Sequence, residues 1–203
     1  MAKKYSVIVF DLGNVLIPFN YDLVIERFNN VSAGLGNKFL DYYMNNYQVH
    51  RKFERGDISE NEFLDIMLGV LENKIDKEKF CNDYSKVFTV DEKVAGLLPR
   101  LKEKYTLVLL SNTNSIHRKY GWDGYDFLKH FDKLILSYEV GAYKPEEKIY
   151  KAAESFTGKP PEEHIFIDDV AEYAQGARNA GWDAVQFKGY DALVNAFSEK
   201  GIL

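Results

Sequence analysis

A continuous apolar run, Ser6 to Phe10, ends directly at the carboxylate of Asp11. Such a run is typical of a strand that is buried on both faces of a parallel sheet. The same pattern occurs twice more, where the apolar runs 107–110 and 164–167 end at Ser111-Asn112 and Asp168-Asp169. Open α/β folds bind ligands at the carboxyl ends of their strands, so the sequence predicts that these side chains meet at one edge of a sheet.

The type of predicted secondary structure changes at two points along the chain. Residues 18–88 carry helical patterns, including a capping box in which Ser59 precedes Glu62 by three residues. From residue 89 onward, strands predicted at 106–110, 133–137, 164–168 and 183–187 alternate with helices, as in βαβ units. These helices include one over 94–101 and one from Pro145 to Phe156, with Phe156 on its inner face. The predicted fold class is therefore α/β: a Rossmann-like parallel sheet core formed by residues 1–17 and 89–203, with a helical-bundle cap formed by residues 18–88.

Charge and composition narrow the choice of partners. The net charge is −5 and no long basic run is present, so we expect no nucleic-acid partner. We also expect no membrane partner, because no apolar segment approaches the length of a transmembrane helix. The single cysteine, Cys81, cannot form an intramolecular disulfide and is expected to be a small core residue, which fits a cytoplasmic protein. The oligomeric state stays open.

The predicted sheet edge has the residue types needed for phosphate chemistry. Asp11 and Asp169, at the ends of neighbouring strands, would give a divalent ion hard oxygen ligands, and Mg²⁺ suits such a site together with substrate phosphate oxygens. A carboxylate can then attack phosphorus. Ser111, the backbone amide of Asn112 and the Lys144 ammonium are suited to the negative oxygens of the transferred group. Each residue also has a simpler interpretation, as a helix cap, a turn former or a solvated surface charge.

Four segments together resemble the motifs of the haloacid dehalogenase-like hydrolases, which are mostly Mg²⁺-dependent phosphatases. They are residues 10–16 (FDLGNVL), 110–113 (LSNT), 141–145 (GAYKP) and 166–169 (FIDD), the last followed by Gly176, Ala177 and Gly181. The resemblance spans nearly the whole chain and includes a helical cap inserted after the first motif. Within the superfamily, the first two motifs look most like those of bacterial sugar-phosphate phosphatases that act on hexose 1-phosphates.

The resemblance assigns a role to each motif residue. It implies that Asp11 is the nucleophile and a metal ligand, and that the Gly13 carbonyl and Asp169 complete the protein ligands of Mg²⁺. Ser111 and Asn112 would bind the phosphate, while Lys144 would neutralise it and steady Asp11. Asp168 would assist the metal without direct coordination. The function implied is hydrolysis of a small phosphorylated metabolite, most of all a sugar phosphate, through an aspartyl-phosphate.

Two positions depart from the family pattern. Gly13 stands where most of these phosphatases have an aspartate that protonates the leaving group, a contribution typically worth about 10²–10⁴-fold. Asn14, a cap residue such as Glu54, or water are possible substitutes. Tyr173 stands where the family usually has Asp or Asn in support of the metal, which predicts weaker Mg²⁺ binding.

Other interpretations stay open for the cap and for the function. The helically spaced Tyr42, Tyr43 and Tyr47 and the segment 50–54 are interpreted as bundle core and solvated rim in preference to a substrate-closing surface, and His117 is expected to be structural. One alternative function is a 2-haloacid dehalogenase, which needs no metal and therefore fits the paired Asp168 and Asp169 poorly. The other is a catalytically weak or inactive protein that binds phosphorylated ligands, which Gly13 and Tyr173 support.

Overall fold

The central element of the structure, a computed structural model that describes residues 4–203, is a parallel sheet in the order β3-β2-β1-β4-β5. Its strands are β1 (Val7–Phe10), β2 (Thr106–Ser111), β3 (Lys133–Leu136), β4 (His164–Asp168) and β5 (Asp183–Gln186). Every neighbouring pair is parallel, and the registers place Phe10 beside Leu109 on one side and Ile167 on the other. The predicted α/β fold is confirmed, and the strands begin and end within a residue or two of the predicted positions.

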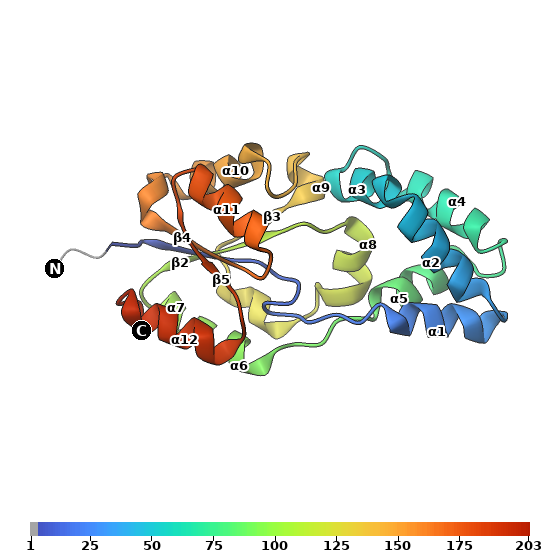
Figure 1. Cartoon of the computed structure of the whole chain (residues 1–203), viewed down its shortest axis with the longest axis horizontal. Helices are drawn as coiled ribbons and strands as arrows, with labels where there is room; N and C mark the ends of the chain where they lie inside the picture. The colour runs from blue at the N-terminus through green and yellow to red at the C-terminus, as the bar shows by residue number, and fades with distance from the viewer. Residues whose placement is uncertain (1–3) are drawn as a thin grey trace.

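Helices cover both faces of the sheet because its strands are apolar on both sides (Figure 1). Val7, Val9 and Phe166 pack toward the helices on one face, whereas Ile8 and Phe10 pack into a second core on the other. The first face is covered by α9 (Ser137–Val140), α10 (Glu147–Thr157) and α11 (Ala171–Asn179), and the second by α6 (Glu92–Ala95), α7 (Leu98–Lys102) and α12 (Tyr190–Glu199). Short segments complete this part: α8 (Ser115–His117), a π-helical turn at Arg118–Trp122 and 3₁₀ turns at Asp126–His130 and Pro161–Glu163.

Seven helices lie between β1 and β2 in the described residues, and the first five of them form a separate layer at one end of the molecule (Figure 1). They are α1 (Asp22–Val31), α2 (Leu35–Asn45), α3 (Tyr47–Arg55), α4 (Glu60–Val70) and α5 (Lys77–Ser85), and we call them the inserted helices. The predicted capping box begins α4, and Asp76 caps α5 by accepting from the Lys79 amide at 2.7 Å. Their buried side chains, including Cys81, form a hydrophobic cluster of their own, joined by Ile116 from α8.

The inserted helices are attached through two adjacent backbone segments. The Asn20 amide donates to the Val87 carbonyl at 3.0 Å, and the Thr89 amide donates to the Pro18 carbonyl at 2.9 Å. Phe19 and Phe88 form an antiparallel bridge between these two bonds. The chain therefore leaves the sheet and returns to it at a single paired point, eight residues after Asp11.

Two helices differ from the sequence prediction. The pattern predicted one helix over 94–101, but Gly96 separates α6 from α7. The helix expected from Pro145 begins instead at Glu147, and Phe156, expected on its inner face, is exposed. Its inner face is formed by Ile149, Tyr150 and Ala153.

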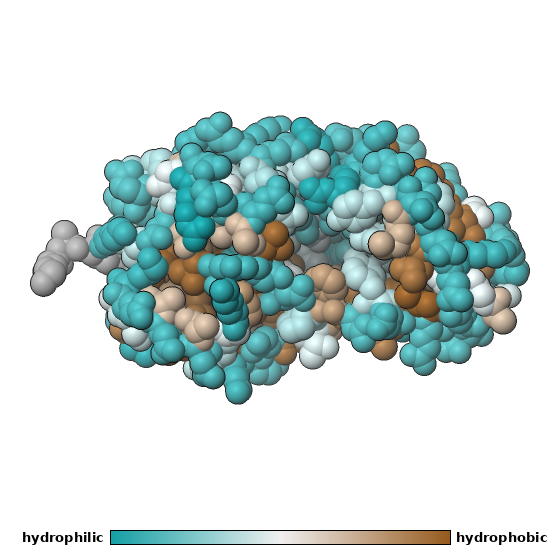
Figure 2. All heavy atoms as spheres, in the orientation of Figure 1, coloured by the Kyte–Doolittle hydropathy of each residue, from teal (hydrophilic) through white to brown (hydrophobic). Residues whose placement is uncertain are grey.

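The surface drawn in Figure 2 is mostly hydrophilic and is hollowed between the sheet and the inserted helices. Hydrophobic residues gather over parts of both halves of this view. Within residues 4–203, no helix combines the length and the apolar character required to cross a bilayer.

Candidate active site

The predicted meeting point of the strand ends exists. The chain order reverses at β1, which has β2 on one side and β4 on the other, and such switch points open a crevice for ligands. Asp11 directly follows β1 and its amide donates to the Ile167 carbonyl at 2.9 Å, so Asp11 lies beside Asp168 in the sheet register. After Asp11 the chain turns sharply, since the Leu12 carbonyl accepts from the amides of Leu16 and Ile17.

One lysine connects two of the carboxylates. The Lys144 ammonium lies 2.7 Å from Asp11 Oδ1 and 2.7 Å from Asp168 Oδ2, and all three side chains are buried. Asp11, Asp168 and Asp169 each offer an oxygen within 4.8 Å of the others'. Three carboxylates therefore cluster where one ammonium group pairs with two of them, and this surplus of negative charge suits a divalent cation with oxygen ligands.

Burial and charge shift the pKa values of these groups. Burial and the adjacent Asp168 raise the pKa of Asp11 against the lowering effect of Lys144. Burial alone would lower the pKa of Lys144, but Asp11 and Asp168 outweigh it and raise that pKa, so the ammonium keeps its proton. Burial and Asp168 also raise the pKa of Asp169. These shifts reflect acids crowded together in the interior, and a bound cation would relieve the crowding.

Asn112 holds the loop that carries Lys144. Its side-chain oxygen accepts from the Lys144 amide at 2.8 Å, and its side-chain amide donates to the Lys144 carbonyl at 3.2 Å. Ser111, the last residue of β2, is buried and its hydroxyl donates weakly to the Asn112 carbonyl at 3.4 Å. The Asn112 side chain is thus a positioning group for Lys144, a role that sequence spacing did not reveal.

The structure shows what surrounds Gly13 and Tyr173, the two positions that depart from the family pattern. The Tyr173 ring lies 5.1 Å from the Lys144 ammonium, where its face contacts the cation. At Gly13, an added Cβ would lie 3.2 Å from Cε1 of Phe19, so the phenyl ring fills the space that a longer side chain would need. Asn14 adopts a left-handed φ of 54° and donates to Asp169 Oδ2 at 3.3 Å.

A cavity of about 300 Å³ lies between the sheet edge and the inserted helices. From the sheet side it is lined by Gly13, Ser111 and Asn112, among others. From the inserted helices it is lined by Tyr21, Tyr43, Tyr47, His50 and Glu54. Its size suits a small metabolite.

The expectation that residues of α2 and α3 form bundle core and solvated rim holds for only some of them. Phe53 is buried in the core of the inserted helices and Tyr42 packs against it, as expected. Tyr43, Tyr47, His50 and Glu54 instead face the cavity. Their signal was a stripe of aromatic and charged side chains at helical spacing, which spacing alone cannot distinguish from a core stripe.

His117 also lines the cavity, and its contacts are structural in kind. Its Nε2 atom lies 3.1 Å from the Tyr21 hydroxyl, and its ring stacks on Tyr84 with centroids 4.2 Å apart. His117 therefore joins α8 to the inserted helices, which agrees with the structural role expected for it.

Comparison with known proteins places these features in a family. D-ribitol-5-phosphate phosphatase from Bacteroides thetaiotaomicron is 25% identical over 186 residues, which cover 88% of this chain and 90% of that protein. A crystal structure of a HAD family enzyme from the same organism matches with a TM-score of 0.82 at 28% identity, covering 96% of this chain and 99% of that one. The same enzyme in complex with magnesium and inorganic phosphate matches with a TM-score of 0.76 at 27% identity, covering 91% and 94%.

The family model for haloacid dehalogenase-like hydrolases matches residues 5–181. This stretch contains all four motif segments, from the end of β1 through α11. The resemblance found in the motifs is thereby confirmed, and the chain belongs to the haloacid dehalogenase-like hydrolase family.

Proposed function

We propose that this hydrolase is a cytoplasmic, Mg²⁺-dependent phosphomonoesterase that acts on a small phosphorylated metabolite, with sugar and polyol phosphates as the leading class. The observation that carries the proposal is the cluster of Asp11, Asp168 and Asp169, two of them paired with the Lys144 ammonium, next to a cavity of metabolite size. The relative that dephosphorylates D-ribitol 5-phosphate supports the substrate class. The single, buried cysteine fits the reducing cytoplasm.

The donor set fits Mg²⁺. We propose that Asp11, Asp169 and the Gly13 carbonyl hold the ion. Asp168 has both oxygens engaged, one by Lys144 and one by the Val170 amide at 2.8 Å, so its part is to position Lys144. When bound, the ion supplies positive charge that allows an anionic phosphate to approach a carboxylate. Its presence in complexes of the related HAD family enzyme supports this assignment.

The nucleophilic oxygen follows from the hydrogen bonds of Asp11. Lys144 and the Leu12 amide both bind Oδ1, at 2.7 Å each, and within residues 4–203 no group binds Oδ2. We assign Oδ2 as the oxygen that attacks phosphorus, since it accepts neither of these two hydrogen bonds. A new bond forms between this oxygen and phosphorus while the bond to the leaving oxygen breaks, giving an aspartyl-phosphate and an alkoxide, which takes a proton from water to become the alcohol.

The phosphoryl oxygens need donors throughout. We propose that the Ser111 hydroxyl, the backbone amide of Asn112 and the Lys144 ammonium bind these oxygens and stabilise the charge of the transition state. A water molecule then attacks phosphorus, inorganic phosphate leaves and the Asp11 carboxylate is restored. Gly13 offers no side chain to protonate the leaving oxygen, which predicts faster turnover of esters with good leaving groups.

We further propose that residues 18–88 act as a cap and that residues 1–17 and 89–203 act as the catalytic core. The separate hydrophobic cluster of the inserted helices and their contribution to the cavity support this division. Under it, the cap residues select the substrate, whereas the strand ends supply the chemistry. The dehalogenase alternative is less well supported, because attack on carbon gives a cluster of three carboxylates no role.

The test is phosphate release from an aryl phosphate and a panel of sugar and polyol phosphates, with and without Mg²⁺. Wild type is compared with Asp11→Asn and with a matched control, Asp191→Asn, at an exposed position of α12. We expect Mg²⁺-dependent turnover that Asp11→Asn abolishes and Asp191→Asn leaves unchanged. No turnover by folded wild type with Mg²⁺ would overturn the proposal in favour of a ligand-binding protein.

A further inference from the structure

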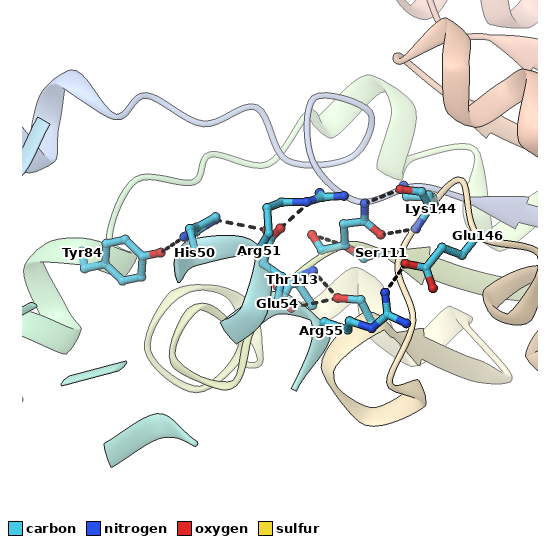
Figure 3. A network of polar contacts seen from close by, with 11 residues as sticks. His50, Arg51, Glu54, Arg55, Tyr84, Ser111, Thr113, Lys144 and Glu146 are labelled. Atoms are coloured by element: carbon cyan, nitrogen blue, oxygen red, sulfur yellow. Dashed lines mark hydrogen bonds and ion pairs between the residues drawn. The ribbon is translucent and has the colours of Figure 1, made fainter. Parts of the chain in front are cut away.

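The cavity contains a carboxylate that takes no part in the metal cluster. Glu54, near the end of α3, is buried and lines the same cavity as Ser111 and Asn112. Figure 3 shows it at the junction between the inserted helices and the loop that carries Lys144. A buried carboxylate at a cavity wall is costly unless partners satisfy it, so its partners indicate its use.

Two side chains of the same helix hold Glu54. His50 Nε2 lies 3.2 Å from Oε1, and Arg51 lies 3.4 Å from Oε2. Burial acts to raise the pKa of Glu54, but His50, Arg51 and the more distant Lys144 outweigh it and lower that pKa. Glu54 is therefore ionised at neutral pH, and an ionised carboxylate accepts hydrogen bonds but donates none.

The position of this carboxylate is set before any ligand binds. The second ring nitrogen of His50, Nδ1, lies 3.1 Å from the hydroxyl of Tyr84, which is fully buried. Arg51 lies over the ring of Tyr143, 3.7 Å from its centroid. Because both partners are themselves held, little ordering is needed when a ligand meets Glu54.

The remaining wall on this side is aromatic. Phe19, Tyr21, Tyr43 and Tyr47 line the cavity around Glu54. Burial raises the pKa of the Tyr43 phenol, so its hydroxyl stays protonated and can donate or accept. Ring faces suit the C–H faces of a carbohydrate chain, and a fixed carboxylate suits its hydroxyl groups.

We propose that Glu54 is the specificity-determining residue of this site: it accepts hydrogen bonds from hydroxyl groups of the ester's alcohol part and selects uncharged, polyhydroxylated phosphate esters. The inference rests on the proposed phosphatase function. A second phosphate or a carboxylate on the ester has no hydrogen-bond donor to offer this carboxylate at neutral pH, so such esters gain nothing at this wall of the cavity. A role as proton donor is disfavoured, because an ionised carboxylate has no proton to give.

The test compares three esters under saturating Mg²⁺. The first is a polyol phosphate, the second an alkyl phosphate of the same carbon number without further hydroxyls, and the third an aryl phosphate. For wild type we expect kcat/KM to be ~10- to 100-fold higher for the polyol phosphate than for the alkyl phosphate, as hydrogen bonds to a charged group imply. Glu54→Gln should remove most of this ratio and leave the alkyl and aryl rates within about twofold.

A matched control is Glu72→Gln, which changes another carboxylate, in the turn between α4 and α5. Glu72 is paired with Lys38 and Lys74 and does not line the cavity, so all three rates should stay at the wild-type level. Thermal denaturation with Mg²⁺ and inorganic phosphate checks that Glu54→Gln is folded. If it is not, the wild-type ratio decides alone.

The outcomes separate the two proposals. No turnover of any ester by wild type contradicts the phosphatase function itself. Turnover with a polyol-to-alkyl ratio near one leaves that function standing and overturns the role of Glu54. Equal losses for polyol and alkyl phosphates in Glu54→Gln, with the aryl phosphate spared, would identify Glu54 as a proton donor and also overturn the assignment as an acceptor.

Discussion

Lys144 and Asp11 form a 2.7 Å ion pair in the interior of the protein, and the same ammonium group reaches Asp168 at 2.7 Å. Neither carboxylate has another cationic side chain within ion-pair distance in residues 4–203. Buried charges that lose their partner destabilise a protein strongly, whereas a satisfied cluster costs little. Under the proposed function, stability and catalysis would therefore depend on the same ammonium group.

Replacing Lys144 by Met should affect both properties. We expect the free energy of unfolding to fall by about 3–5 kcal/mol in the absence of Mg²⁺, because two buried carboxylates are left unpaired. Added Mg²⁺ should restore part of this loss, while phosphate release stays ~10²- to 10³-fold below wild type. Urea denaturation with and without Mg²⁺ measures the first effect. Lys148→Met, at a lysine that donates to the Gly141 carbonyl on the surface, should change neither property.

Replacing Asp169 by Asn should weaken Mg²⁺ binding. The side chain stays the same size, but the site loses one of its negative oxygen ligands, so we expect the Mg²⁺ concentration for half-maximal activity to rise by at least ~10-fold. A Mg²⁺ titration of phosphate release measures it. The control is Glu172→Gln, three residues further along at an exposed position. An unchanged titration for Asp169→Asn would show that the ion lies elsewhere.

Introducing an acid at position 13 should raise kcat only if the Phe19 ring no longer occupies the space beside it. The added Cβ would lie 3.2 Å from Phe19 Cε1, so Gly13→Asp alone is crowded by the ring. We expect Gly13→Asp combined with Phe19→Ala to raise kcat for an alkyl phosphate by ~10²-fold over Phe19→Ala, with little change for an aryl phosphate that needs no protonation. Gly13→Asp alone and Phe19→Ala alone complete the double-mutant cycle. Equal gains in Gly13→Asp and in the double variant would contradict the crowding.

His117 should make the protein less stable below neutral pH. Burial lowers its pKa well below 6.5, and within residues 4–203 its Nδ1 atom has no hydrogen-bond partner. The unfolded chain therefore binds a proton below pH 6.5 that the folded protein does not, and stability falls as the pH falls. We expect His117 to contribute a loss of about 1.4 kcal/mol between pH 7.5 and 5.5.

Urea denaturation across this range, compared with His117→Gln, measures that contribution. Burial also lowers the pKa of His164, but His164 is present in both proteins, so the difference reports His117 alone. Parallel pH profiles for the two proteins would contradict the prediction.

The sheet and its reactive edge could be predicted because their signals are local. A run such as 7–10 is apolar on both faces only if a parallel sheet buries it, and a parallel sheet brings the residues after each run to one edge. Asp11, Ser111 and Asp168 follow from that geometry alone. The capping box at Ser59 is likewise a contact within four residues.

The remaining features depend on contacts between distant segments. Asn112 and Lys144 are 32 residues apart, and only the folded sheet shows that the Asn112 side chain binds the backbone of Lys144. The position of Glu54 at the cavity likewise depends on contacts between distant segments. Helical spacing placed it on a face of α3, but which face meets the sheet depends on how five helices pack, and that packing leaves no periodic signal.

The paired segments at the base of the inserted helices have a consequence for protein engineering. Because the Pro18 carbonyl and the Thr89 amide are hydrogen bonded, the two cut ends left by removing the residues between them would already be neighbours. A short turn would close that gap, and a different binding module could be spliced in at the same place. The strand ends would stay the same, and replacing the inserted segment would change the ligand preference without altering any residue of the sheet.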